Sequence, residues 1–212
     1  MFNPIEIIFC VVLSAVLTVL GSRWIDRLYA REDAPLSFPD DISARSRFRR
    51  PLLSIGLFIC ILLSVKRTPI EAPYLIAASF FLLLITATDF EQYVIFDRMT
   101  LPFAVVGLIS ALHLQLPLVD RLMAGLIGGA GFLLLAVATR GSLGGGDIKL
   151  IAALGLWFGT ERLLDIVVCG SIFGGVAALF LLLSKKMNRK SVFAYGPYFA
   201  LTALCFLLAQ PQ

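Results

Sequence analysis

The stretch Ser79-Phe-Phe-Leu-Leu-Leu-Ile-Thr-Ala-Thr-Asp89 is an apolar run that ends abruptly in a carboxylate. Similar apolar stretches recur along the whole chain of 212 residues, of which 59% are hydrophobic and 15% are charged. The mean hydropathy of +0.92 is far above that of a water-soluble domain. Because a bilayer core about 30 Å thick takes roughly 20 apolar residues per helix, we expect an all-α fold, a polytopic membrane helical bundle.

Charged and turn-rich positions divide the chain into about eight candidate transmembrane helices. These helices cover residues 4–21, 51–65, 73–88, 99–116, 122–139, 148–158, 164–183 and 192–209. The sixth is short, because its residues rise only about 16 Å at 1.5 Å each. We expect it to be tilted, extended by its neighbours, or re-entrant and sheltered within the protein.

The Lys and Arg residues fall unevenly on alternate connections between these helices. One side carries 14 of the 18, and the other carries Lys66, Arg67, Arg121 and Arg162. The richer side comprises seven arginines from Arg23 to Arg50, together with Arg98, Arg140, Lys149, Lys185, Lys186, Arg189 and Lys190. Because cytoplasmic loops carry an excess of Lys and Arg, we assign this side to the cytoplasm and both termini to the outside.

The net charge of +4 reflects this topological bias, so we predict membrane lipid and no nucleic acid among the partners. The cluster Arg45, Arg47, Arg49 and Arg50 is interpreted as an anchor at the membrane edge. The alternative is that it holds anionic lipid or an acidic partner.

The four cysteines, Cys10, Cys60, Cys169 and Cys205, lie singly in apolar stretches, without a CxxC pair or a Cys/His cluster. We expect buried thiols, no disulfide framework and no metal site. The opening apolar segment lacks a basic n-region and an A-x-A-like site, so we interpret it as a retained helix.

Asp89 is the first candidate for a catalytic residue. It directly follows an apolar run, and an ionisable residue at such a place is costly unless it serves a function. An acid at the C-terminal end of a helix also opposes the helix dipole. Something other than local helix stability therefore favours a carboxylate at this position.

Asp147 is the second candidate, because Gly144, Gly145 and Gly146 precede it and an apolar segment follows it. Three glycines allow positive φ angles and the close approach of another backbone, which suits an acid that faces a peptide. Asp147 could instead be the N-cap of the short helix, since Asp is a preferred cap residue. Both interpretations stay open for Asp147 taken alone.

The two aspartates fall at cytoplasmic helix ends in the topology derived from Lys and Arg. Two carboxylates close enough to share a proton leave one ionised and the other protonated. The ionised group is then a general base for water and the protonated group a general acid. Among the competing groups, Asp97 and Arg98 are interpreted as a local turn or ion pair, and His113 as a packing or interface residue.

Three ordered segments resemble the type IV prepilin peptidase family, the GxGD-type aspartic proteases of the bacterial inner membrane. They are Thr88-Asp-Phe-Glu-Gln-Tyr-Val-Ile-Phe-Asp-Arg-Met-Thr-Leu-Pro102, Gly144-Gly-Gly-Asp-Ile-Lys-Leu-Ile-Ala-Ala-Leu-Gly155 and Tyr195-Gly-Pro-Tyr-Phe-Ala-Leu201. In the first segment, Phe96 replaces the proline usual in the family.

The resemblance implies that Asp89 and Asp147 are the catalytic pair. It implies site-shaping roles for Lys149, Gly196 and Pro197, which join the glycines before Asp147; a helix-end cation and a helix start are the alternatives for these three. The implied activity is an aspartic endopeptidase that removes the basic leader of prepilin or pseudopilin precursors, for a type IV pilus or for protein secretion. It acts at the cytoplasmic face and needs no cofactor.

We expect a single integral membrane domain over residues 1–212. Residues 1–72 form N-terminal helices with a basic cytoplasmic loop at 22–50, and residues 73–212 form the peptidase core. Many members of the family carry two CxxC pairs in this loop and also N-methylate the product, whereas this loop has no cysteine. We therefore predict neither zinc binding nor methyl transfer from S-adenosylmethionine.

Two interpretations from other functional classes stay open. The first is a small membrane transporter in which Asp89 and Asp147 relay protons, which would place acids at the bilayer midplane. The second is a non-catalytic assembly scaffold of a pilus or secretion system that retains the motif.

Overall fold

A computed structural model describes residues 3–139, 143–184 and 193–209 of the chain. These residues form α-helices and one short 3-10 helix, without a strand among them. The elements are α1 (Pro4–Tyr29), η1 (Pro39–Asp41), α2 (Ile42–Arg45), α3 (Arg49–Ser64), α4 (Ala72–Gln92), α5 (Asp97–His113), α6 (Leu118–Ala138), α7 (Gly145–Leu183) and α8 (Gly196–Ala209). The expected all-α bundle is confirmed.

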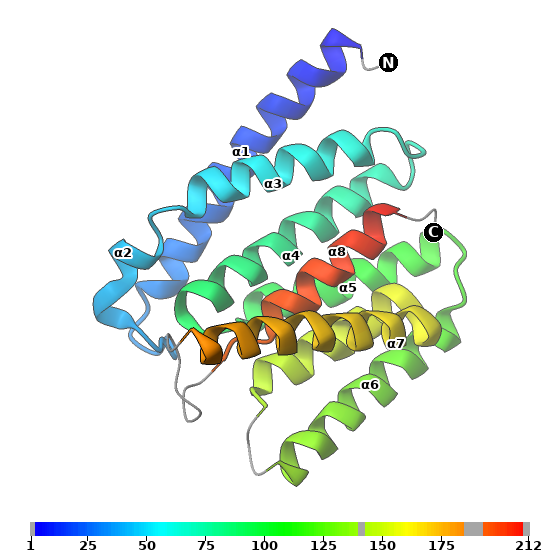
Figure 1. Cartoon of the computed structure of the whole chain (residues 1–212). Helices are drawn as coiled ribbons and strands as arrows, with labels where there is room; N and C mark the ends of the chain where they lie inside the picture. Colours follow the sequence, from blue (N-terminus) through cyan, green and yellow to red (C-terminus); the bar gives the residue numbers. More distant parts are fainter. Residues whose placement is uncertain (1–2, 140–142, 185–192, 210–212) are drawn as a thin grey trace.

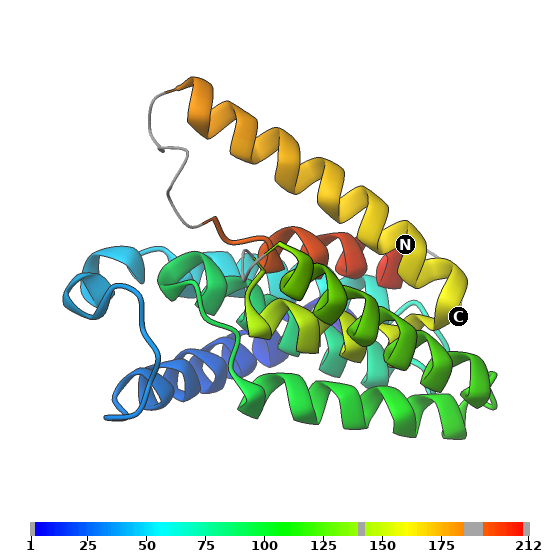
Figure 2. The same cartoon turned by 90° about the horizontal axis from the view of Figure 1, so that it is seen from below.

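The helices pack side by side along the bundle (Figure 1). Helix α3 packs on α1 and α4, α4 packs on α5 and α8, and α7 packs on α5, α6 and α8. Figure 2 shows the second half of α7 inclined across the bundle, close to α8. As a result, the C-terminal end of α4, the N-terminal end of α7 and the start of α8 can meet.

Helix α1 is longer than the apolar run that predicts it. It starts at an Asn3 cap, whose side chain accepts from the Ile5 N–H, and it continues beyond Gly21 to Tyr29. Ser22 and Tyr29 are buried on this extension. The expected loop at 22–50 is therefore wrong in extent, because its first two turns are helical and pack against α3.

Helix α7 is broken at Gly159, whose φ of 76° and ψ of −179° are not helical. The break separates a short first half, residues 145–158, from a longer second half, residues 160–183. Asp120 accepts hydrogen bonds from the Thr160 N–H and hydroxyl at the start of the second half. Arg121 donates to backbone carbonyls at the end of the first half. The predicted short sixth helix is thus present as the first half of α7. The predicted seventh helix is the second half of α7, and it begins earlier than the expected residue 164.

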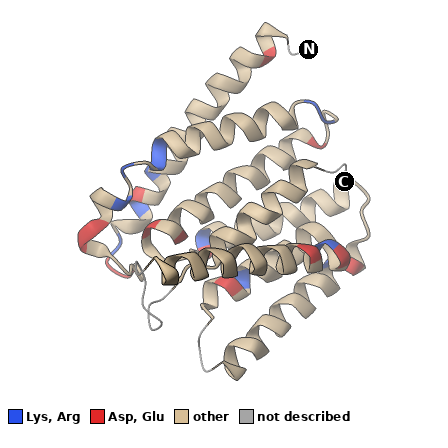
Figure 3. Cartoon of the chain, viewed as in Figure 1, with Lys and Arg blue, Asp and Glu red and all other residues tan. Residues whose placement is uncertain are grey.

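The surface of the bundle is apolar, with large hydrophobic side chains exposed on α1, α3, α6 and the second half of α7. Helices α1, α4, α6 and α7 are long and apolar enough to cross a membrane. Figure 3 shows the acidic and basic residues gathered at helix ends and connections, away from the middle of the helices. These features are those of a multi-pass helical membrane protein.

The four cysteines are free thiols, but burial differs from the expectation. Cys10 and Cys60 are buried, Cys169 is half-buried and Cys205 is exposed on the apolar surface. Several of the cations in the topology count lie outside the described residues, namely Arg140, Lys185, Lys186, Arg189 and Lys190. The expected start of the last helix at residue 192 lies there too, and α8 begins at Gly196.

Candidate active site

Asp89 lies one turn before the end of α4 and is only 5% exposed. The helix ends at Tyr93, which has the left-handed φ of 53° and donates its backbone N–H to the Asp89 carbonyl. Such a φ is uncommon for a residue other than glycine. The Tyr93 ring is held edge-on by Phe38, with ring centroids 5.1 Å apart. This sharp, supported stop fixes the helix turn that carries Asp89.

Asp147 lies in the first turn of α7. The N-cap residue is Gly144, whose carbonyl accepts from the Asp147 N–H at 3.1 Å. The N-cap interpretation of Asp147 is therefore wrong, because Gly144 holds that position. A negative charge in the first turn is favoured by the positive end of the helix dipole.

The two carboxylates converge beside Gly196 at the start of α8. A Cβ atom built on Gly196 would lie 2.5 Å from Asp89 Oδ2 and 3.1 Å from Asp147 Oδ1. These two oxygens are therefore less than about 6 Å apart, a separation at which two carboxylates interact directly. The backbone N–H of Gly196 is adjacent to the Asp89 carboxylate. Any larger residue than glycine would press on both acids.

The same two oxygens are buried, and neither has a hydrogen-bond partner among the described residues. An unpaired buried carboxylate oxygen is costly, and such groups in native proteins call for an explanation. Two unpartnered carboxylate oxygens within about 6 Å of each other are suited to hold a water molecule between them. The geometry is thus that of a carboxylate dyad.

Ile95 covers this dyad from the connection between α4 and α5. Its Cδ1 atom would lie 2.8 Å from a Cβ on Gly196, and its Cβ atom 2.8 Å from a Cβ on Gly146. Gly146 thus allows the connection to pass close to α7. A cavity of about 340 Å³ adjoins the connection and is lined by residues 94–98, by residues of the loop 31–35 and by Lys149.

The remaining predicted site residues are Gly144, Gly145, Lys149 and Pro197. A Cβ on Gly144 would lie 3.3 Å from Asp147 Oδ2, whereas a Cβ on Gly145 would meet nothing within 4 Å. Lys149 forms an ion pair with Asp97, with Nζ 2.7 Å from Oδ1. From the sequence, Asp97 and Arg98 are interpreted as a local turn or an ion pair. They lie in the first turn of α5, and the ion-pair interpretation is wrong, because Asp97 pairs with Lys149 of α7 instead. Pro197 is buried in the first turn of α8.

The sequence did not identify the ion pair between Arg49 and Glu91. Glu91 lies on α4, two residues after Asp89. The side chain of Arg49 is 2% exposed and that of Glu91 is 6% exposed, with Arg49 Nη2 2.8 Å from Glu91 Oε2. The interpretation of Arg49 as a membrane-edge anchor is wrong, because its guanidinium points into the protein. The single sequence signal is a second acid two residues after Asp89, and it does not reveal the partner.

No group of three or more potential metal ligands occurs in the part of the chain that the structure describes. The groups that the structure brings together at the dyad are two carboxylates and the backbone around them. The fold and this site define the class: a multi-pass helical membrane protein with a buried aspartate pair at the ends of its helices.

The sequence profile of the type IV leader peptidase family matches residues 76–179 of the chain. The matched region contains both Asp89 and Asp147. The chain is similar to proteins named prepilin leader peptidase/N-methyltransferase. It is 30% identical over 132 residues to the one from Xanthomonas campestris pv. campestris, covering 59% of this chain and 46% of that protein.

Two further relatives carry the same name. The one from Pseudomonas putida is 28% identical over 168 residues, covering 74% of this chain and 57% of the relative. The one from Escherichia coli (strain K12) is 29% identical over 164 residues, covering 71% of this chain and 72% of the relative. The chain thus spans about half the length of several of the curated relatives it matches. No solved structure matches the chain.

Proposed function

We propose that the chain is a membrane aspartic endopeptidase that removes the leader peptide of prepilin or pseudopilin precursors. The observation that carries the proposal is the convergence of Asp89 Oδ2 and Asp147 Oδ1 beside Gly196, both buried and both unpartnered among the described residues. The match to the family profile and the names of the relatives support the substrate class.

The reaction needs one ionised and one protonated carboxyl group. The ionised aspartate removes a proton from water as the water oxygen attacks the scissile carbonyl carbon. The protonated aspartate gives its proton to the carbonyl oxygen, which forms a tetrahedral diol. The amine nitrogen then takes a proton from the aspartate that acted as the base, and the C–N bond breaks. A hydroxyl of the diol gives its proton to the other aspartate, so the new carboxyl and amine leave and the dyad is restored.

The elements around the dyad favour a peptide as the substrate. The connection 93–96 between α4 and α5 is not helical, and the backbone of Val94 and Ile95 makes no hydrogen bond to other described residues. The adjoining cavity has room for a segment of chain, and displacement of the Ile95 side chain would open the dyad to it. Asp147 lies at the N-terminal end of the first half of α7, where the apolar segment begins. In the proposal, the scissile bond meets water at this end.

The excess of Lys and Arg supports a dyad at the cytoplasmic face, and the match to the family profile supports a location in the bacterial inner membrane. In this proposal residues 73–212 are the peptidase core, and residues 1–72 are N-terminal helices that pack on it. The proposed activity does not include methyl transfer, because the loop between α1 and α3 has no cysteine. The names of the relatives do include it.

A transporter that relays protons through the same two aspartates is the second candidate. The position of both acids at helix ends, rather than at the middle of the apolar spans, weighs against it. A non-catalytic scaffold would bind precursors and leave them intact.

Purified protein in lipid vesicles, incubated with a prepilin whose leader is intact, tests the proposal. Wild type should release the leader at a single bond, identified by mass spectrometry, while Asp89→Asn should release none. Asp165→Asn, which changes an exposed aspartate in the second half of α7, should behave as wild type. Intact precursor after incubation with folded wild type would contradict the peptidase proposal. An added methyl group on the product would show that the protein is also a methyltransferase.

A further inference from the structure

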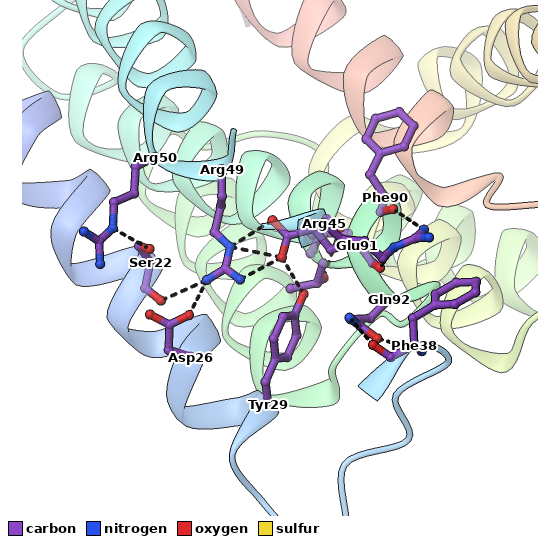
Figure 4. A network of polar contacts seen from close by, with 12 residues as sticks. Ser22, Asp26, Tyr29, Phe38, Arg45, Arg49, Arg50, Phe90, Glu91 and Gln92 are labelled. Atoms are coloured by element: carbon purple, nitrogen blue, oxygen red, sulfur yellow. Dashed lines mark hydrogen bonds and ion pairs between the residues drawn. The ribbon is translucent and has the colours of Figure 1, made fainter. Parts of the chain in front are cut away.

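A buried network of hydrogen bonds and ion pairs holds the last turn of α4 (Figure 4). The Glu91 carboxylate accepts hydrogen bonds from Arg49 Nε at 2.9 Å and Nη2 at 2.8 Å. It also accepts one from the Tyr29 hydroxyl at 3.1 Å. Arg49 in turn forms an ion pair with Asp26 on α1. Three helices, α1, α3 and α4, are therefore joined at one carboxylate, two residues beyond Asp89.

The backbone of the same turn is held as well. The last carbonyls of a helix have no partner within it, and Arg45 of α2 donates to those of Phe90 and Glu91. Gln92 exchanges two hydrogen bonds with the backbone of Phe38, as donor and as acceptor. Each of the three residues that follow Asp89 is thus fixed by the segment that precedes α3.

We infer that Arg49 and Glu91 are positioning residues, which hold the end of α4 so that Asp89 meets Asp147. The inference rests on the proposed function and extends it, because Arg45, Arg49, Asp26 and Tyr29 lie outside the region matched by the family profile. The N-terminal helices then contribute to catalysis, because their contacts with α4 fix the position of Asp89. They do more than anchor the core in the membrane.

The choice of a charged pair supports a positional role. Removing two charges from water costs as much as their attraction returns, so an apolar pair of similar volume stabilises a fold at least as well. Contacts between apolar side chains, however, do not fix the angle at which two helices meet. A guanidinium binds a carboxylate through a planar fork of two hydrogen bonds, which fixes both distance and angle. The network therefore gives α4 a defined rotation and end point.

Arg49→Lys tests the inference, because it keeps the charge and loses the fork. In the prepilin cleavage assay we expect kcat to fall by about ten- to a hundredfold, since small displacements of a catalytic group cost rate rather than binding. KM should change less than about twofold. The matched control is Arg47→Lys, at an exposed arginine two residues earlier, and it should keep both constants.

The double variant Arg49→Met, Glu91→Leu separates position from stability. It removes both buried charges together, so we expect a melting temperature near that of wild type and a kcat as low as that of Arg49→Lys. Recovery of wild-type kcat in the double variant would overturn the inference, because the network would then serve stability alone. An unchanged kcat in Arg49→Lys would overturn it as well.

A second readout is independent of cleavage. The carbon NMR signal of the Asp89 carboxyl, assigned by its loss in Asp89→Asn, should move in Arg49→Lys and stay in place in Arg47→Lys. If wild type fails to cleave the precursor, the proposed function fails while this signal still tests the positioning. An Asp89 signal unmoved by Arg49→Lys would contradict the inference whatever the protein does to precursors.

Discussion

Asp89 and Asp147 each bring one carboxylate oxygen to the same point beside Gly196, Oδ2 of the first and Oδ1 of the second. Asp89 comes from the end of α4 and Asp147 from the first turn of α7, while α8 contributes a glycine between them. The site thus needs three helix ends to meet. The absence of a side chain on Gly196 is as much a part of the arrangement as the two acids.

Gly196→Ala should slow cleavage strongly while the protein stays folded. The added Cβ would lie 2.5 Å from Asp89 Oδ2, so the carboxylate or the start of α8 must move. A displacement of this kind costs on the order of a hundredfold in rate. Gly175→Ala is the control, because a Cβ there meets nothing within 4 Å. Initial rates of leader release measure both, and a Gly196→Ala variant as active as the control would show that the dyad tolerates a side chain at this point.

Cleavage should depend on pH with a bell-shaped profile. At low pH the general base becomes protonated and loses its ability to take a proton from water. At high pH the general acid loses the proton that it must donate, so the rate falls again. The two midpoints belong to the coupled pair rather than to either aspartate. Measurement of kcat/KM across the pH range at constant ionic strength checks this, and a profile with one limb would contradict the need for both forms.

Asp120→Ala should destabilise the protein without changing the chemistry. Asp120 accepts hydrogen bonds from the Thr160 N–H and hydroxyl, and it thereby caps the second half of α7 across the break at Gly159. Loss of a cap of this kind costs about 1 kcal/mol. Unfolding in detergent should show the loss, and Asp165→Ala should not. A fall in kcat of folded Asp120→Ala would mean that the break and the dyad are coupled.

The ion pair of Lys149 with Asp97 should contribute little to stability. Both side chains are more than half exposed, at 56% and 54%, and exposed pairs are worth about 0–1 kcal/mol. A double-mutant cycle with Lys149→Met and Asp97→Leu, read by unfolding at low and high salt, measures the coupling. A coupling well above this range, or one insensitive to salt, would show that the pair is tighter than its exposure indicates.

The apolar runs predict most of the helices, because lipid leaves few alternatives to a helix for a stretch of this length. The prediction is wrong where a helix continues into polar sequence. Helix α1 runs on to Tyr29 because its last two turns pack against α3, and no hydropathy value signals this. The second half of α7 begins immediately after Gly159, where the positive φ and not a charged residue makes the break.

The two aspartates could be predicted because a carboxylate at the end of an apolar run is costly and conspicuous. Their convergence at Gly196 could not, since it depends on how α8 docks between α4 and α7. The pairing of Arg49 with Glu91 was out of reach for the same reason. An arginine in a basic cluster has the same sequence pattern whether it faces lipid headgroups or, as here, a buried acid.

In the proposed mechanism Asp89 and Asp147 act as one catalytic unit. The most direct test is to compare kcat/KM for leader release by wild type, Asp89→Asn, Asp147→Asn and the double variant. Groups that act together lose nearly all of their effect when either is removed. We predict that each single variant is as inactive as the double variant. Cleavage retained by either single variant, or a double variant much slower than both, would contradict the dyad.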